Sequence, residues 1–268
     1  MGGEKVLKKM PRWYKILFIL WNQTEYGRWV RLEMSIKAVL FDLDGTLLPM
    51  DYDGFIKLYF GALAKKLAGH GYEPEQLVKD IWAGTAAMVK NDGSCTNEEC
   101  FWNAFEAIYG KKVREDMVYF EEFYRDNFRV AKEACGFDPL AGQVVESLKQ
   151  RGIPVVLATN PIFPMIATKQ RIEWAGLKVE DFELCTTYEN IGYSKPNPMY
   201  YKEIAKRIGV EPSECLMVGN DVSEDMVAKN VGMQVFLLTD CLLNEKKEDI
   251  SGYPQGGFRE LKNYLEAL

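Results

Sequence analysis

Short apolar runs separated by helical patterns are the feature that most limits how this chain can fold. The runs are rich in β-branched and aliphatic residues and occupy residues 38–41, 153–158, 182–186, 215–218 and 235–238. From residue 153 onward they alternate with segments of helical periodicity at 165–175, 199–208, 224–231 and 258–268. Strands that alternate with helices predict an α/β fold, in which a parallel sheet is covered on both faces. Burial on both faces also explains why the runs are continuously apolar rather than alternating.

A long helical stretch interrupts this pattern between the first two strands. Its apolar residues recur at helical spacing, first over residues 56–67 and again over 117–131. Thr96 and Glu99 have the spacing of a capping box at a helix start. A simple crossover needs about a dozen residues, so this stretch is several times too long. We therefore predict a helical cap domain at 51–136, inserted into an α/β core made of 34–50 and 137–268.

The first 33 residues form a segment of their own. They start with basic residues and contain an apolar run, residues 16–21, that is too short to span a membrane. No small-residue cleavage site follows this run. We interpret residues 1–33 as an N-terminal extension or a helix that docks a partner, with Met34 as an alternative start.

Composition excludes several classes of function. The formal net charge of −6 disfavours general nucleic-acid binding, which needs a basic surface. The single histidine, His70, rules out a multi-histidine metal site and lies between glycines in a predicted loop. The six cysteines show no CxxC spacing, which is typical of reduced thiols in a reducing compartment. We therefore expect a cytoplasmic protein with no membrane span.

Acidic residues follow two of the predicted strands. Asp42 and Asp44 come directly after the first strand, and Asp221 and Asp225 follow the run at 215–218. The carboxyl ends of parallel strands meet at one edge of a sheet, where ligands bind. If the two strands are neighbours, four carboxylates converge and require a cation. Oxygen-only ligation indicates Mg²⁺.

Polar residues from two further segments reach the same edge. Thr159 and Asn160 follow the run at 153–158. Lys195 lies in the loop after the run at 182–186, directly before Pro196 and Pro198. A carboxylate nucleophile, a second carboxylate, a cation, a hydroxyl and an ammonium together suit stabilisation of a phosphoryl group in transfer.

This set of residues resembles the four motifs of the haloacid dehalogenase superfamily. The matching segments are the Asp-Leu-Asp-Gly-Thr at 42–46, Thr159, Lys195, and the Gly-Asn-Asp at 219–221 with Asp225, in the family's order over residues 35–240. The resemblance implies a doubly wound, Rossmann-like core of the phosphatase type with an inserted cap. One departure is Asn220, which stands between the glycine and the aspartate of the fourth motif.

The resemblance also implies a role for each residue. Asp42 would be the nucleophile that forms an aspartyl-phosphate, and Asp44 the general acid and base. Thr159, Asn160 and Lys195 would bind the phosphoryl group. Asp42, the backbone carbonyl of Asp44, Asp221 and Asp225 would hold Mg²⁺, with Asp225 acting directly or through water.

Each residue also has a simpler interpretation. Asp44-Gly45 could be a turn that ends a strand, and Thr159 with Asn160 could cap a helix. Lys195 could be a solvated loop residue, and Asp221 and Asp225 could be acids of a first helical turn. The motifs occurring together favour the catalytic interpretation.

We therefore expect a Mg²⁺-dependent phosphatase of a small phosphorylated metabolite. The alternatives are a phosphomutase of the same superfamily and a non-catalytic member that binds a ligand. A polar cap loop supplies Lys90, Asn91 and Ser94 as candidates for substrate selection, although its composition favours a plain surface loop. The sequence leaves open the substrate and the choice between a monomer and a homodimer.

Overall fold

The computed structural model describes residues 36–267, and within them it contains a six-stranded parallel sheet. The predicted extension at 1–33 lies outside the described residues. The strand order is β3-β2-β1-β4-β5-β6. The strands are β1 Ala38–Phe41, β2 Val155–Leu157, β3 Leu184–Cys185, β4 Cys215–Gly219, β5 Gln234–Leu238 and β6 Gln255–Gly256. The predicted α/β fold with a doubly wound parallel sheet is confirmed.

The sheet reverses its winding at β1. The chain moves from β1 outward to β2 and β3, and then returns to β4 on the other side of β1. Val39 pairs with Val155 on one neighbour and with Leu216 on the other. Ligand sites of doubly wound sheets lie at such a switch point, outside the carboxyl ends of the strands. Here the switch point lies between β1 and β4, the two strands that precede the predicted carboxylates.

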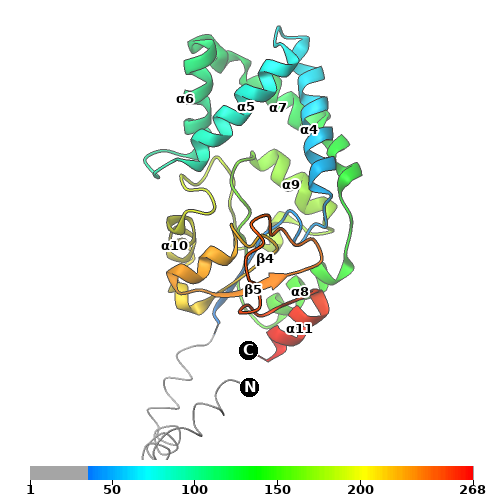
Figure 1. Ribbon diagram of the computed structural model, residues 1–268, viewed down its shortest axis with the longest axis vertical. Helices are drawn as coiled ribbons and strands as arrows, with labels where there is room; N and C mark the ends of the chain where they lie inside the picture. Colours follow the sequence, from blue (N-terminus) through cyan, green and yellow to red (C-terminus); the bar gives the residue numbers. More distant parts are fainter. Residues whose placement is uncertain (1–35, 268) are drawn as a thin grey trace, which may run out of the picture. The chain divides into compact units, whose positions relative to one another are not determined.

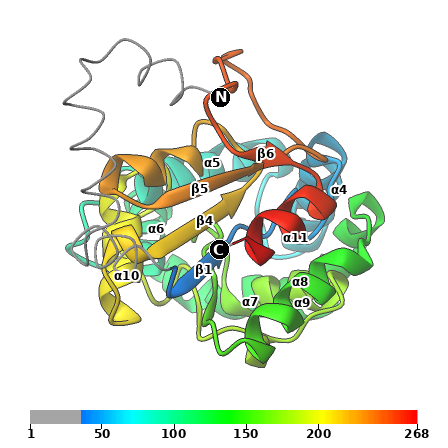
Figure 2. The ribbon, with the colours of Figure 1, turned by 90° about the horizontal axis from the view of Figure 1, so that it is seen from below.

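Helices cover both faces of the sheet because β1 is apolar on both faces. Ala38 and Leu40 join one buried cluster with Tyr200 and Ile204 of α10. Figure 2 shows α10 on one side of the sheet and α8 and α11 on the other. The helices of the core are α8 Pro139–Gln150, α9 Met165–Trp174, α10 Pro198–Arg207 and α11 Phe258–Glu266, and the 3₁₀ helices are η3 Val179–Asp181, η4 Pro212–Glu214 and η5 Met226–Val231.

The helices of residues 51–136, which lie between β1 and α8 in the chain, are grouped beyond one end of the sheet (Figure 1). We call residues 51–136 the cap and the rest of residues 37–267 the core. The predicted capping box begins α6, where the Thr96 side chain accepts a hydrogen bond from the Glu99 amide. The cap elements are α4 Tyr52–Ala68, α5 Pro74–Val89, α6 Asn97–Tyr109, η1 Lys111–Asp116, α7 Met117–Asp126 and η2 Phe128–Ala134.

A buried asparagine joins the cap to the core. Asn97, at the start of α6, is fully buried. Its amide nitrogen donates to the Pro161 carbonyl oxygen at 3.0 Å and to the Ser194 hydroxyl at 2.9 Å, and its side-chain oxygen accepts from the Asn91 amide at 2.9 Å. Pro161 and Ser194 belong to core loops near Asn160 and Lys195. This network fixes one end of the cap against those loops.

None of the helices between residues 36 and 267 is long and apolar enough to cross a membrane.

Candidate active site

Asp42 and Lys195 form a buried ion pair at the end of β1. The amide of Asp42 continues the sheet by donating to the Val218 carbonyl of β4 at 2.9 Å. The Lys195 Nζ lies 2.8 Å from Asp42 Oδ1 and 2.6 Å from Asp225 Oδ1, and the lysine side chain is only 1% exposed. Burial opposes the charge of Lys195, but the two carboxylates outweigh it and raise its pKa well above the usual value. Lys195 therefore remains an ammonium that neutralises both acids.

Asp44 lies in the turn that follows β1 and contacts a different cation. Gly45 forms the turn at a φ of 84°, in the left-handed region that glycine tolerates best. One carboxylate oxygen of Asp44 contacts the guanidinium of Arg171, and the other is buried without a hydrogen-bond partner among the described residues. Burial raises the pKa of Asp44 to about 6, and the charge of Arg171 partly offsets this effect. Asp44 can therefore be protonated or ionised near neutral pH.

The loop after β4 holds Asp221 in a fixed orientation. Asp221 Oδ1 accepts hydrogen bonds from the amides of Ser223 and Glu224, at 2.7 and 2.9 Å. The preceding residue, Asn220, links this loop to the β1 turn because its Oδ1 accepts from the Thr46 hydroxyl at 2.8 Å. Burial raises the pKa of Asp221. Its second carboxylate oxygen receives no hydrogen bond from residues 36–267 and is available to a ligand.

Both carboxylate oxygens of Asp225 have protein donors. Its Oδ1 binds Lys195, and its Oδ2 accepts a hydrogen bond from the Asp221 amide at 3.0 Å. Asp225 is therefore placed to orient Lys195 and the Asp221 loop. Its metal binding, directly or through water, stays a prediction.

Metal binding by the four aspartates stays a prediction. Between residues 36 and 267, no group of three or more histidine, cysteine, aspartate or glutamate side chains could hold a metal ion. Arg171 engages the carboxylate of Asp44, and Lys195 engages that of Asp225. The metal role that the resemblance gives Asp44 uses its backbone carbonyl and not this carboxylate. Asp42 and Asp221 each retain an oxygen free of protein donors, which fits Mg²⁺, because this ion commonly uses one or two carboxylates together with water and substrate phosphate.

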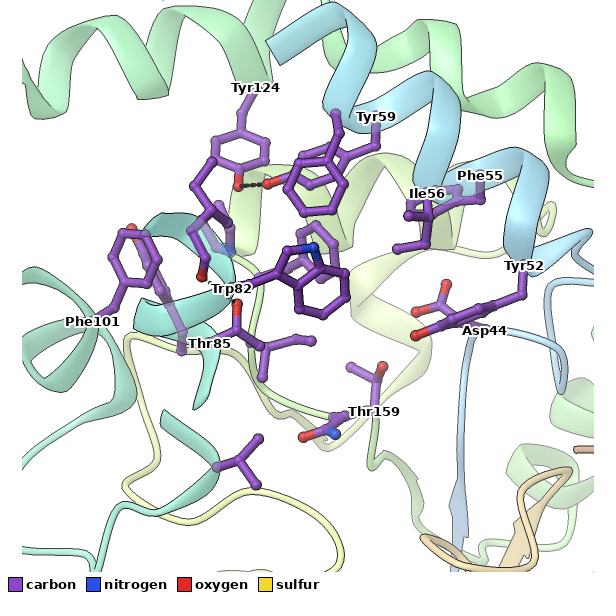
Figure 3. A pocket seen from close by; sticks show the side chains of 18 of the residues that line it. Asp44, Tyr52, Phe55, Ile56, Tyr59, Trp82, Thr85, Phe101, Tyr124 and Thr159 are labelled. Atoms are coloured by element: carbon purple, nitrogen blue, oxygen red, sulfur yellow. Dashed lines mark hydrogen bonds between the residues drawn. The ribbon is translucent and has the colours of Figure 1, made fainter. Parts of the chain in front are cut away.

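Thr159 and Asn160 follow β2 and line the same pocket. The Thr159 carbonyl accepts from the Tyr200 hydroxyl at 2.8 Å, and its side chain faces the pocket (Figure 3). The Asn160 amide nitrogen instead donates to both carboxylate oxygens of Glu224 at 3.1 Å. Thr159 is therefore open to a ligand, whereas the donors of Asn160 point to Glu224.

The structure brings the predicted residues together and adds two that we did not predict. Arg171 is 1% exposed, and its guanidinium lies 4.5 Å from the centre of the Phe163 ring. Glu224 is partly buried, and its desolvation raises its pKa to about 7. The position of Glu224 between Asp221 and Asp225 of the fourth motif is a sequence signal that would have placed it at the site. Arg171 gave no signal, because an arginine in an amphipathic helix is usually solvated.

The three candidates of the cap loop do not line the pocket. Lys90 and Ser94 are exposed, and Asn91 is buried and donates to the Cys95 carbonyl and to Asn97. The cap residues that line the pocket come from α4, α5, α6 and α7, among them Tyr52, Trp82 and Tyr124 (Figure 3).

Comparison with known proteins agrees with this geometry. The model of the haloacid dehalogenase-like hydrolases matches residues 36–232. A phosphoglycolate phosphatase of Shigella dysenteriae is 26% identical over 245 residues, covering 87% of this chain and 93% of that protein. The pyrophosphatase PpaX of Bacillus cereus is 26% identical over 203 residues, covering 74% and 81%.

The fold is also found among solved structures. A haloacid dehalogenase phosphatase from Thermococcus onnurineus superposes with a TM-score of 0.52 at 21% identity, covering 85% of this chain and 97% of that one. The match of the family model over most of the chain agrees with the parallel sheet and with the residues at its edge. The chain therefore belongs to the haloacid dehalogenase-like hydrolases.

Proposed function

We propose that this protein is a Mg²⁺-dependent phosphatase that hydrolyses a small phosphorylated metabolite through a phosphoaspartate at Asp42. The observation that supports this most directly is the contact of Lys195 Nζ with Asp42 Oδ1 at 2.8 Å. Asp44, two residues after Asp42, can be protonated near neutral pH. The family relatives named for phosphoglycolate and pyrophosphate hydrolysis support the same type of reaction.

The reaction begins with attack of an Asp42 carboxylate oxygen on phosphorus. As the new O–P bond forms, the bond from phosphorus to the leaving oxygen breaks, and protonated Asp44 gives its proton to that oxygen. Lys195 and Thr159 bind the phosphoryl oxygens and stabilise their charge in the transition state. The products of this step are the free alcohol and phosphorylated Asp42.

The second step returns the protein to its starting state. Ionised Asp44 takes a proton from water, and the water oxygen attacks phosphorus. The bond between phosphorus and Asp42 breaks, which releases inorganic phosphate and regenerates the Asp42 carboxylate. Asp42, Asp221 and the Asp44 carbonyl would hold Mg²⁺, which when bound supplies positive charge to the phosphoryl group.

The test is hydrolysis of p-nitrophenyl phosphate by the full chain. We expect activity with Mg²⁺, its loss with EDTA and recovery on adding Mg²⁺ again. Asp42→Asn should lower kcat by about a thousandfold or more, since it removes the nucleophile. Asp126→Asn, an exposed aspartate of α7, is the matched control and should retain full activity.

The same assay distinguishes the alternatives. A phosphomutase would need a bisphosphate activator and would release little inorganic phosphate, whereas the phosphatase releases phosphate without one. A non-catalytic member would give equal, negligible rates for the wild type and Asp42→Asn over a broad panel of phosphate esters. That last result would overturn the proposal.

A further inference from the structure

The pocket above Asp42 and Asp44 is a cavity of about 290 Å³ between the cap and the core. Beyond the carboxylates, most of its wall is aromatic or aliphatic, as Figure 3 shows for the labelled residues around Trp82. The apolar wall comes from the cap helices α4, α5, α6 and α7 and from core residues near Thr159. It includes Tyr52, Tyr59, Trp82 and Tyr124 of the cap and Phe163 of the core.

Within the described part of the chain, no cation is available at the cavity to bind a second negative charge. Among residues 36–267, those that line the cavity include no lysine, arginine or histidine, while Glu121 and Glu224 add to its acidic groups. The two nearby cations, Lys195 and Arg171, are each about 1% exposed and are already paired with carboxylates. An anionic group carried into the wall of the cavity would therefore be desolvated without a counter-charge, which is strongly unfavourable.

Three hydroxyl groups of the wall already have partners within the protein. The hydroxyls of Tyr59 and Tyr124 lie 2.9 Å apart, in the hydrogen bond drawn in Figure 3. The Thr85 hydroxyl donates to the Ile81 carbonyl at 2.9 Å. A leaving group with many hydroxyls would have to break such bonds to find partners. The wall is thus poorly suited to a sugar as well as to an anion.

Two large side chains at the cavity remain unusually exposed. Tyr52 and Trp82 are each 48% exposed, although both line the cavity. An apolar ligand would remove this surface from water and so bind more tightly. The apolar wall, the lack of a counter-charge and the exposed aromatic side chains all favour an uncharged, apolar ligand. The cavity volume is roughly twice that of a 150 Å³ cavity that holds benzene.

We propose that the leaving group of the substrate is uncharged and mainly apolar, such as an alkyl or aryl alcohol of about six to ten carbon atoms. This inference rests on the proposed phosphatase function. It separates the protein from relatives whose names refer to phosphoglycolate and pyrophosphate, because both of those leaving groups are anionic.

The experiment compares kcat/KM of the full chain with Mg²⁺ on matched alkyl phosphates. In the series ethyl, butyl and hexyl phosphate, each added methylene should raise kcat/KM by up to about fourfold. Hexyl phosphate is then compared with 5-carboxypentyl phosphate, which has the same length but ends in a carboxylate. We expect hexyl phosphate to be preferred by about a hundredfold, since the carboxylate loses its hydration.

A variant connects this preference to the cavity. Trp82→Lys places an ammonium in the wall and should reduce the preference for hexyl over 5-carboxypentyl phosphate by at least about tenfold. Trp82→Phe keeps the wall apolar and is the matched control, which should retain the preference. Trp82 is half exposed, so both variants should fold.

The outcomes separate this inference from the proposed function. Hydrolysis of p-nitrophenyl phosphate together with a preference for hexyl phosphate below about tenfold would overturn the inference and leave the phosphatase function intact. An unchanged preference in Trp82→Lys would also overturn it. If no phosphate ester is hydrolysed, the proposed function fails, and the inference fails with it.

Discussion

Arg171 controls the charge environment of Asp44. Its guanidinium contacts the Asp44 carboxylate and lies 3.2 Å from the Thr168 hydroxyl, in a position that is closed to solvent. In the proposed reaction Asp44 must be protonated to release an alcohol, so its pKa of about 6 sets the pH above which the first step slows.

Removal of this charge should change the pH profile in a defined direction. In Arg171→Met the lost positive charge lets the Asp44 pKa rise, so Asp44 stays protonated to higher pH. The fall of kcat/KM for hexyl phosphate with rising pH should therefore move upward by about one pH unit or more. Arg171→Lys keeps the charge and is the control. A fall at unchanged or lower pH would contradict this role of Arg171.

Gly219 leaves room for the carboxylate of Asp225. A methyl group at position 219 would overlap with that carboxylate, which binds both Lys195 and the Asp221 amide. Gly219→Ala should therefore lower the free energy of unfolding by about 1–3 kcal/mol and reduce activity. The measurements are urea denaturation and p-nitrophenyl phosphate hydrolysis.

The control for this substitution is another glycine of the core. A methyl group at Gly142 in α8 would meet no atom within 4 Å. Gly142→Ala should raise stability by about 0.5–1 kcal/mol, because alanine favours a helix interior. Equal effects of the two substitutions would show that the contact with Asp225 is not what matters at Gly219.

At the scale of residues, the sequence locates the site better than it describes the contacts within it. Asp42, Asp44, Thr159 and Asp221 follow strands whose ends must meet in a parallel sheet, so their common location was predictable. Their roles in catalysis and metal binding stay predictions. The pairing of Asp225 with Lys195, and of Asp44 with Arg171, depends on side-chain geometry that no sequence pattern encodes.

At the scale of the structural elements, the start of α6 fixes one end of the cap to the core. Asn97→Ala would remove the hydrogen bonds to Pro161, Ser194 and Asn91 and leave buried partners unsatisfied. We expect the free energy of unfolding to fall by about 2–4 kcal/mol, as measured with urea. Asn103→Ala on the same helix removes an exposed contact with Arg114 and should change stability by less than about 0.5 kcal/mol. Similar losses in both variants would argue against a buried connection at Asn97.

The strands were predictable as elements, whereas one helix was only partly so. Buried parallel strands have continuous apolar runs, and each of the five predicted runs overlaps one strand of the sheet. The segment predicted as a helix at 224–231 is instead a 3₁₀ helix that begins at Met226. Its late start follows from the turn before it, in which the Asp221 carboxylate binds the amides of Ser223 and Glu224. β6 has only two residues, one of them glycine, and its sequence gave no signal.

At the scale of the molecule, the cavity is made by the cap and the core together. Helical periodicity predicted the cap, but it could not show which side of each helix faces the site. We expect the heat capacity change on binding to be more negative for hexylphosphonate than for methylphosphonate, because the longer chain buries more apolar surface. Calorimetry at several temperatures measures this difference. Equal heat capacity changes would mean that the chain stays in water.

The chain enters and leaves the cap at almost the same place. Met50 pairs with Cys135 in an antiparallel bridge, and the Gly136 amide donates to the Pro49 carbonyl at 2.7 Å. Two adjacent junctions of this kind allow the intervening segment to be exchanged for another of different length while β1 and β2 keep their register. Recombination at these two junctions would give the same core a different cap and so a different substrate range, which makes them suitable crossover points for building chimeric enzymes.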